Sequence, residues 1–249
     1  MTSAAPGVRL RMRAELTGQI LETARRHLAE NGAAALSLRA VARELGLAPS
    51  ALYRYFPSRD ELLTTLVNEA YDAIGDAAEA AATPERAPDL TSRFQAACRA
   101  VRRFALDHPQ EYSLIFASPV PGYEAPEATV AAAARVPTVL AGLLSEALVA
   151  GRLRPMPGAA APLSPSTRAE LERLIAVAVP GLVPDVLARG ILAWTTIFGL
   201  VSFELYGHLA GSIDDTEAFF EWSVDSLARY VGLEVAGPVA PRVTSSDAQ

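Results

Sequence analysis

Apolar residues recur at helical spacing along most of the chain, and no segment alternates apolar and polar residues as a β-strand would. The clearest short example is Leu38, Val41, Ala42 and Leu45, which fall at i, i+3, i+4 and i+7 and form one apolar stripe. The pattern predicts an all-α protein of about nine or ten helices. The longer helices are expected over residues 58–82, 90–107, 127–150 with a break at Pro137, 166–179, 184–209 and 215–231.

Residues that start and stop helices divide the segment around that stripe into short pieces. Ser37 is placed to cap the first helix, and Gly46 can take the left-handed conformation that ends it. Pro49 suits the first position of the next helix, and Ser58 with Glu61 forms a capping box that opens another. Two short helices joined at a glycine indicate a helix-turn-helix, whose second helix lies in the DNA major groove.

Side chains with DNA-binding chemistry project from the second of these helices. Ser50, Tyr53 and Arg54 share one face, whereas Leu52 and Phe56 should pack inward. Arginine binds phosphates or guanine edges, and hydroxyl groups bind phosphate oxygens. An ordinary helical hairpin with a solvated basic face would give the same local pattern. The predicted DNA-binding set is Ser37, Arg39, Pro49, Ser50, Ala51, Tyr53, Arg54 and Arg59, with Arg39 and Arg59 as phosphate contacts.

Charge is distributed unevenly along the chain. Residues 1–60 carry nine arginines and five acidic residues, a balance of +4, whereas the remainder carries 13 arginines and 23 acidic residues, a balance of −10; the two sum to the net charge of −6. A basic N-terminal quarter on an acidic body is expected where only one end meets phosphate. Arg9, Arg11 and Arg13 could extend this surface as an arm, or belong to a disordered leader, which we favour.

Many positions of this N-terminal segment belong to one coordinated pattern: Ile20-Leu21, Ala24, Asn31-Gly32, Ser37, Arg39, Ala42, Leu45-Gly46-Leu47, Leu52-Tyr53, Tyr55-Phe56 and Ser58 to Leu63. With this pattern the segment resembles the DNA-binding domain of the TetR family of bacterial repressors over roughly residues 13 to 65. Ala48 and Ala51 depart from the family pattern, because neither offers a polar group. The resemblance implies a homodimer that binds double-stranded operator DNA and releases it when a small-molecule effector binds.

A chain of 249 residues can hold one small and one larger domain. We expect a disordered basic leader over residues 1–10 and a three-helix DNA-binding domain over 11–57. A larger helical ligand-binding and dimerisation domain should follow over 58–233, and a disordered tail over 234–249.

The most apolar segment of the larger domain is Gly190 to Leu209. Its uncharged run, between Arg189 and Glu204, is 14 residues long, which is below the roughly 17 to 25 residues of a membrane span. We therefore expect a central helix that faces its own domain on one side and a second copy of the chain on the other. With Trp194 and Gly199, the segment also resembles a TetR subfamily whose corresponding helix carries a tryptophan and then a His-Gly pair, although Phe198 stands at the histidine position.

A ligand pocket between the helices could be lined by aromatic residues, with polar groups fixing the ligand. The same aromatic residues could equally be plain core. Glu204 and His208, four residues apart, could form a polar pair or two metal ligands; without a third ligand we favour the pair. The predicted pocket residues are Tyr112, Phe116, Trp194, Phe198, Glu204 and His208.

Nothing in the sequence indicates catalysis, a metal site or a cofactor. There is no glycine-rich phosphate loop and no G-x-S-x-G motif, and the single cysteine, Cys98, fits a buried thiol in a reducing cytoplasm. We therefore expect a cytoplasmic, ligand-released transcriptional repressor without a membrane span. The alternatives are a helical small-molecule carrier or enzyme with an incidental N-terminal hairpin, and a regulator that acts through protein partners.

Overall fold

The computed structural model describes residues 6–117, 119–154 and 162–234. Within these ranges all regular structure is helical, which confirms the all-α prediction. There are eleven α-helices there, more than expected, because the 127–150 segment is split and a short helix follows residue 108. The α-helices are α1 (Pro6–Asn31), α2 (Leu38–Glu44), α3 (Pro49–Leu52), α4 (Arg59–Ala81), α5 (Leu90–Asp107), α6 (Pro109–Phe116), α7 (Val130–Ala133), α8 (Arg135–Val149), α9 (Pro165–Ala178), α10 (Pro184–Leu205) and α11 (Thr216–Val231), with 3-10 turns η1 (Ala33–Ala35) and η2 (Glu127–Thr129).

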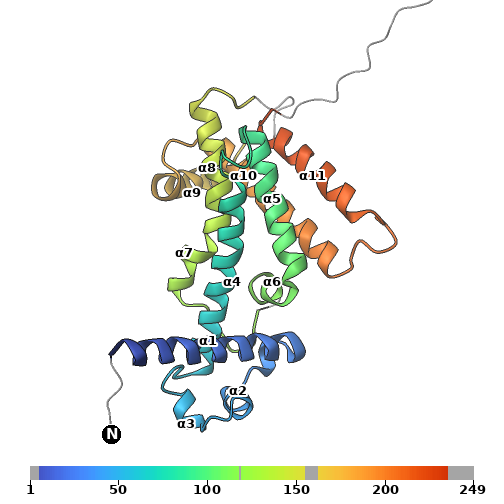
Figure 1. The fold of residues 1–249 in the computed structure, drawn as a ribbon. Helices are drawn as coiled ribbons and strands as arrows, with labels where there is room; N and C mark the ends of the chain where they lie inside the picture. Colours follow the sequence, from blue (N-terminus) through green and yellow to red (C-terminus); the bar gives the residue numbers. More distant parts are fainter. Residues whose placement is uncertain (1–5, 118, 155–161, 235–249) are drawn as a thin grey trace, which may run out of the picture.

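Helices α1 to α3 form a small domain at the foot of the molecule, as Figure 1 shows. Its core consists of apolar side chains from α1, α2, α3 and the first turns of α4. Ile20, Val41 and Leu52 are fully buried there. The apolar stripe predicted for α2 therefore faces α1 and holds the helix-turn-helix together.

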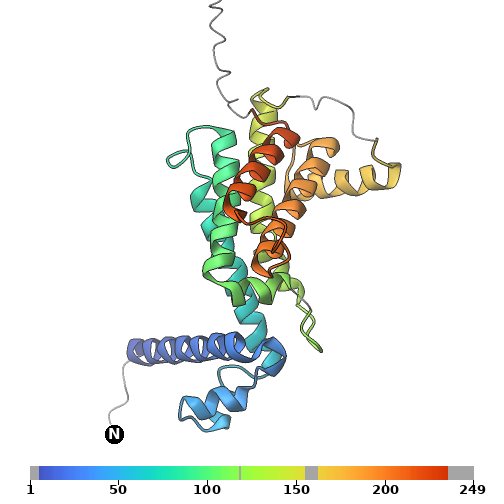
Figure 2. The same ribbon diagram turned by 90° about the vertical axis from the view of Figure 1, so that its right-hand side faces the viewer.

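Helix α4 connects this small domain to the larger one above it (Figures 1 and 2). Leu62 and Leu63, near its beginning, are buried in the lower core, whereas Ile74 and Ala78 are buried in the upper core. One helix thus contributes side chains to both cores.

The larger domain is a bundle built around α4, α5, α8, α10 and α11, with α9 packed against α10. Figure 2 shows α9 extending sideways from the bundle. Phe94, Leu144, Ile197 and Val224 are fully buried at the bundle's centre. The apolar sides of five helices thus meet in one core, as the helical periodicity predicts.

Several helix ends lie where the sequence places them. Ser58 accepts a hydrogen bond from the Glu61 amide at 3.1 Å and caps α4. Gly232 ends α11 with φ of 96°, in the left-handed region that glycine enters without strain. Asp215, the first residue of the helix expected over 215–231, is instead the cap of α11 and accepts from the Ala218 amide at 2.9 Å.

Other helix ends differ from the prediction. The break expected at Pro137 falls at Ala134, where the η2–α7 segment and α8 meet at an angle of 47°. Pro137 has no N–H for the carbonyl four residues earlier, and its ring would clash with that carbonyl, so the bend precedes it. Helix α1 begins at Pro6, so residues 6–10 are helical where a disordered leader was expected; most of the predicted tail, 235–249, lies outside the described residues.

Candidate nucleic-acid interface and effector domain

The helix-turn-helix is held by short-range contacts. The Ser37 hydroxyl accepts a hydrogen bond from the Ala40 amide at 3.5 Å and caps α2. Gly46 takes φ of 65°, and the chain then enters α3 through Ala48, which is extended and makes no side-chain cap. Helix α3 is a single turn, because its regular hydrogen bonding ends at Leu52.

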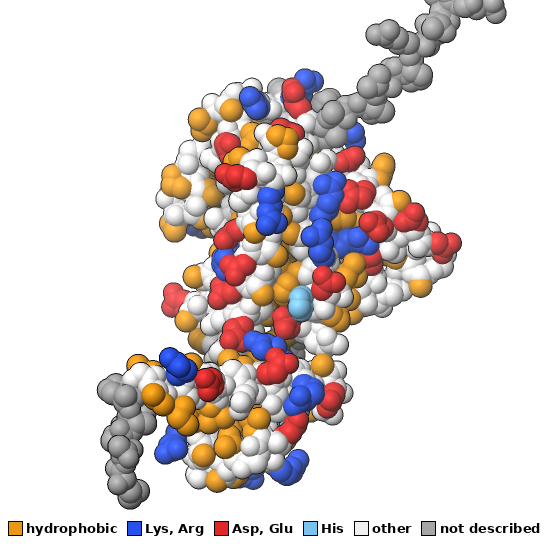
Figure 3. All heavy atoms as spheres, in the orientation of Figure 1, with side chains coloured by type: hydrophobic (Ala, Val, Ile, Leu, Met, Phe, Trp, Pro, Cys, Tyr) orange, Lys and Arg blue, Asp and Glu red, His pale blue; other side chains and the backbone are white. Residues whose placement is uncertain are grey.

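The structure exposes most of the predicted DNA-binding set. Tyr53 is 41% exposed, and Arg54 beside it is exposed too. Figure 3 shows basic side chains, in blue, distributed over the foot of the molecule, where this domain lies. Of the remaining members, Arg39, Pro49 and Ser50 are exposed, whereas Ser37 and Ala51 are half-buried.

Arg59 is engaged within the protein. Its Nε donates to the Leu36 carbonyl at 3.2 Å, and its Nη2 donates to the Ala33 carbonyl at 2.9 Å. Nη1 lies 3.5 Å from Asp60. Arg59 therefore fastens the beginning of α4 to the turn before α2. A phosphate contact through the outer part of this guanidinium stays a prediction.

Arg43 was missed at the level of sequence, and the contact that Arg13 makes was not predicted. Arg43 is exposed on α2, four residues after Arg39 and therefore on the same helix face; that spacing could have revealed it. Arg13 lies with its guanidinium 5.5 Å from the ring centre of Tyr55. No local pattern indicates this contact, because α1 and the α3 segment are brought together only by folding.

Polar contacts tie the small domain to the larger one. Arg25 on α1 binds Glu69 on α4 at 2.6 Å and lies 3.7 Å from Glu111 on α6. Thr64 and Tyr123 form a hydroxyl–hydroxyl hydrogen bond of 3.0 Å. The loop after α6 thus contacts α4 close to the DNA-binding core.

Four of the predicted pocket residues form an aromatic cluster inside the larger domain. The Phe116 and Phe198 rings lie 4.4 Å apart, with Tyr112 at 5.0 Å from Phe116 and Trp194 at 6.0 Å from Phe198. The Tyr112 hydroxyl donates to the Phe198 carbonyl at 3.1 Å and lies 3.0 Å from the Ser202 hydroxyl. Burial raises the pKa of Tyr112 to about 12. Tyr112 therefore stays neutral and packs as core.

The predicted pairing of Glu204 with His208 does not form. Glu204 instead accepts from Arg102 Nε at 2.8 Å and Nη2 at 2.7 Å, and from the Thr216 hydroxyl at 2.8 Å. The Arg102 hydrogen bonds hold the pKa of the Glu204 carboxyl below its ordinary value. His208 is exposed in the turn after α10, since that helix ends at Leu205.

A cavity of about 220 Å³ lies between α8, α9 and α10. Trp194 is the one member of the predicted pocket set that lines it. None of the lining side chains is ionisable. The lining residues are Ala134, Pro137, Thr138, Leu140, Ala141, Leu174, Ala178, Val179, Leu187, Gly190, Ile191 and Trp194.

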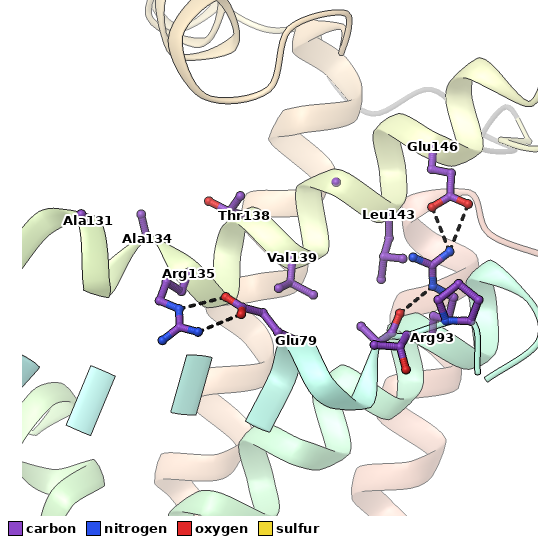
Figure 4. A pocket seen from close by; sticks show the side chains of 13 residues that line it. Glu79, Arg93, Ala131, Ala134, Arg135, Thr138, Val139, Leu143 and Glu146 are labelled. Atoms are coloured by element: carbon purple, nitrogen blue, oxygen red, sulfur yellow. Dashed lines mark hydrogen bonds and ion pairs between the residues drawn. The ribbon is translucent and has the colours of Figure 1, made fainter. Parts of the chain in front are cut away.

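A more open groove of about 650 Å³ separates α7 and α8 from α4 and α5. Figure 4 shows ion pairs near its ends, with Arg135 reaching Glu79 and Arg93 reaching Glu146. Arg135 also binds Asp72 and Asp76, and these partners raise the pKa of its guanidinium. Its charge is thus matched within the protein, and it fastens the start of α8 to α4.

Three further features bear on the classes of function considered: the cysteine, metal-binding side chains and membrane-spanning helices. Burial raises the pKa of the Cys98 thiol, which keeps the thiol protonated in the core. Among the described residues, no group of three or more side chains is arranged to hold a metal ion. By length and composition alone, α10 could cross a membrane. The η2–α7 segment and α8 would form a second candidate only if the two, bent against each other, were one membrane span. However, α10 packs against α5, α8, α9 and α11, as the core helix of a bundle does.

Comparisons with known proteins agree with this geometry. Residues 20–66 match the bacterial regulatory proteins of the tetR family, and residues 94–227 match the tetracyclin repressor-like C-terminal domain. The HTH-type transcriptional regulator Rv1816 of Mycobacterium tuberculosis is 37% identical over 202 residues, which cover 81% of this chain and 85% of the relative.

Solved structures show the same architecture. The crystal structure of the protein SCO4313 has a TM-score of 0.72 and 34% identity, and the match covers 87% of this chain and 97% of that one. PfmR from Thermus thermophilus, at 20% identity and a TM-score of 0.57, shares the fold over 87% of this chain and 99% of its own. With its helix-turn-helix, its helical body and these relatives, the chain belongs to the TetR family of transcriptional regulators.

Proposed function

We propose that this chain is a homodimeric repressor that binds a pseudo-palindromic operator and leaves it when a small molecule binds. The observation that carries the proposal is the exposed set of hydroxyl and guanidinium groups on α2 and the α3 segment, at the end of the molecule away from the acidic body. Two such surfaces would enter successive major grooves about 34–36 Å apart. The protein would act in the cytoplasm, in contact with DNA and without membrane attachment.

Each predicted residue has a distinct role in this proposal. Tyr53, Arg54 and Ser50 would contact base edges or phosphates directly. Pro49 and Ala51 would contact DNA only through apolar atoms. Ser37, Arg39 and Arg59 would meet the flanking phosphates. Arg43 joins Arg39 on the exposed face of α2 and strengthens that part of the surface.

The dimer is supported by apolar side chains that a single chain leaves in solvent on α10 and α11. Trp222 is 64% exposed, Phe203 is 53% exposed, and Leu192 and Tyr206 are exposed as well. Helices α10 and α11 pack side by side, so these residues belong to neighbouring surfaces (Figure 2). A second copy would remove this apolar area from water, which is the main driving force for association. It would also set the spacing of the two recognition segments.

Effector control depends on the relative affinity of the ligand for two conformations of the protein. A ligand can shift the spacing of the DNA-binding domains only as far as it binds one conformation more tightly than the other. Helix α4 is suited to carry that shift, because it contributes side chains to both cores.

The test is a gel-shift titration with the DNA upstream of the gene. The double variant Tyr53→Ala, Arg54→Ala should abolish specific binding, because both exposed contacts of the recognition segment are removed. Arg39→Ala should lower affinity for all sequences and reduce the salt-dependence slope by about 0.9, the contribution of one phosphate contact.

The matched control is Arg173→Ala, which removes an exposed arginine on α9 in the larger domain. It should leave both operator affinity and salt dependence unchanged. Operator binding that survives the Tyr53→Ala, Arg54→Ala double variant would refute the assignment of the recognition segment. Absence of specific DNA binding by the wild-type chain would favour a carrier or a regulator that acts through protein partners.

A further inference from the structure

We propose that the cavity between α8, α9 and α10 is the effector site, and that it takes an uncharged, mainly aromatic molecule with one hydrogen-bond acceptor, which Trp194 Nε1 recognises. The inference deepens the proposed function and rests on the protein being effector-controlled. It departs from the aromatic set predicted from sequence, since Tyr112, Phe116 and Phe198 pack on one another instead.

The size of the cavity sets the size of the molecule. Its volume is about 220 Å³, and a cavity of about 150 Å³ in another protein accommodates benzene. A benzene ring with one small substituent therefore fits. Most drug-sized ligands occupy sites of about 300 to 1,000 Å³, so a larger ligand would have to open this one further.

The lining determines the polarity of the molecule. It is formed by aliphatic and aromatic side chains, proline, glycine and Thr138, which is itself exposed. Transfer of an ionised group into such surroundings without a partner is strongly unfavourable. The site therefore selects against carboxylates and amines and in favour of neutral molecules.

Trp194 supplies the polar handle. Its Nε1 is buried and has no hydrogen-bond acceptor among the described residues. A buried donor left unsatisfied is unfavourable, and an acceptor on a ligand would recover part of that loss. Trp194 lines the cavity, whereas its Nε1 is closed to solvent, so a ligand acceptor would reach this N–H after a rotation of the indole, and one residue would then provide both ring contact and the hydrogen bond.

The cavity's position gives a bound molecule a route to the DNA-binding domain. Ala134, Pro137 and Thr138 line the cavity, and Arg135, between them in sequence, binds Glu79 on α4. A ligand that displaces the start of α8 would therefore displace Arg135 and, through it, α4.

The experiment uses the full wild-type chain, whose two tryptophans give two indole N–H resonances in a ¹H–¹⁵N spectrum. The resonance that Trp194→Phe removes is that of Trp194. The probes are acetophenone, isopropylbenzene and benzoate, which have similar size and shape but differ in acceptor and charge. Acetophenone should move the indole proton downfield, and isopropylbenzene should not.

Affinities by calorimetry complete the comparison. One hydrogen bond contributes roughly 1 kcal/mol, so acetophenone should bind about fivefold more tightly than isopropylbenzene, and benzoate should bind more weakly than either. Trp194→Phe should remove the preference for acetophenone. Ala178→Leu, at the cavity, should weaken binding of both neutral probes. Ala176→Leu, exposed on the same helix but outside the cavity lining, is its control.

The outcomes separate this inference from the function on which it rests. Equal binding of acetophenone and isopropylbenzene, tightest binding of benzoate, or binding unaffected by Ala178→Leu relative to Ala176→Leu would each overturn the site. Operator binding by a chain that takes none of the probes would leave the repressor standing and refute the cavity. The expected pattern of probe binding by a chain that binds no operator would support the site and refute the repressor.

Discussion

The ion pair between Arg102 on α5 and Glu204 on α10 makes a sharp prediction about stability. Both side chains are largely buried, at 15% and 11% exposed. Arg102→Ala would leave the Glu204 carboxylate with Thr216 as its remaining partner. An uncompensated charge at this depth is expensive, because the protein interior solvates it poorly.

The expected magnitude follows from the burial. Removal of one partner of a buried pair costs about 3–5 kcal/mol, and the residual exposure of this pair places the cost near the lower end, at about 3 kcal/mol. The Arg102 guanidinium also lies 5.3 Å from the Phe220 ring centre, a contact that contributes about 0.5 kcal/mol where it is partly solvated. For a chain of this size, the loss corresponds to a fall in Tm of about 6–12 °C.

The same helix offers a matched control. Arg99 on α5 binds Glu221 on α11 through both Nε and Nη2, at 2.6 to 2.9 Å, but each side chain is 39% exposed. Ion pairs with this degree of exposure contribute about 0–1 kcal/mol, because water screens the charges. Arg99→Ala should therefore lower the free energy of unfolding by less than about 1 kcal/mol.

The assay is urea denaturation followed by far-UV circular dichroism. All variants are compared at one protein concentration, since the stability of a dimer depends on it. Equal losses for Arg102→Ala and Arg99→Ala would refute the argument, because burial would then not govern the cost. A loss below about 1 kcal/mol for Arg102→Ala would refute it as well.

The remaining predictions concern acid stability, a helix cap and a glycine. The hydrogen bonds from Arg102 lower the pKa of the Glu204 carboxyl. The stabilisation that the ion pair provides is therefore complete above the unfolded pKa of about 4.3 and is lost as pH falls through the folded pKa. The difference in free energy of unfolding between wild type and Arg102→Ala, measured in urea, should accordingly shrink below about pH 4. Ala48→Ser should raise Tm, since a serine cap on α3 adds about 0.5–1 kcal/mol; an unchanged Tm would contradict this. Gly232→Ala should destabilise by more than the 1–2 kcal/mol of backbone strain alone, because its Cβ would lie 2.8 Å from a backbone oxygen. Gly181→Ala is the control, because Gly181 has φ of 93° and a Cβ there would have nothing within 4 Å; equal losses would exclude the clash.

Local sequence was sufficient for many helix ends, because they depend on residues close in the chain. Ser37 and Ser58 cap α2 and α4, and Gly46 takes the positive φ that its place after Leu45 predicts. Pro137 correctly indicated a broken helix. The break lies at Ala134 because the clash of a proline acts on the carbonyl four residues before it.

Partners of charged groups were not predictable in this way. Glu204 was paired with His208 from a spacing of four residues, but its partner is Arg102, separated by 102 positions. Arg59, predicted to contact phosphate, also binds carbonyls 23 and 26 residues away, which no spacing near it in the sequence indicates. Spacing along the chain indicates partners only within one helix, whereas in the folded protein several helices pack around each charged group.

The sequence by itself determined the helical class, the helix-turn-helix near the N-terminus and the basic character of that end, because periodicity, caps and charge are local properties. Only the tertiary structure decided which guanidinium groups remain exposed, that Tyr112, Phe116 and Phe198 pack as core, and that the cavity beside Trp194 lies between α8, α9 and α10. These features depend on where α5, α8, α9 and α10 meet. That arrangement results from the simultaneous burial of all their apolar faces, which no single segment encodes.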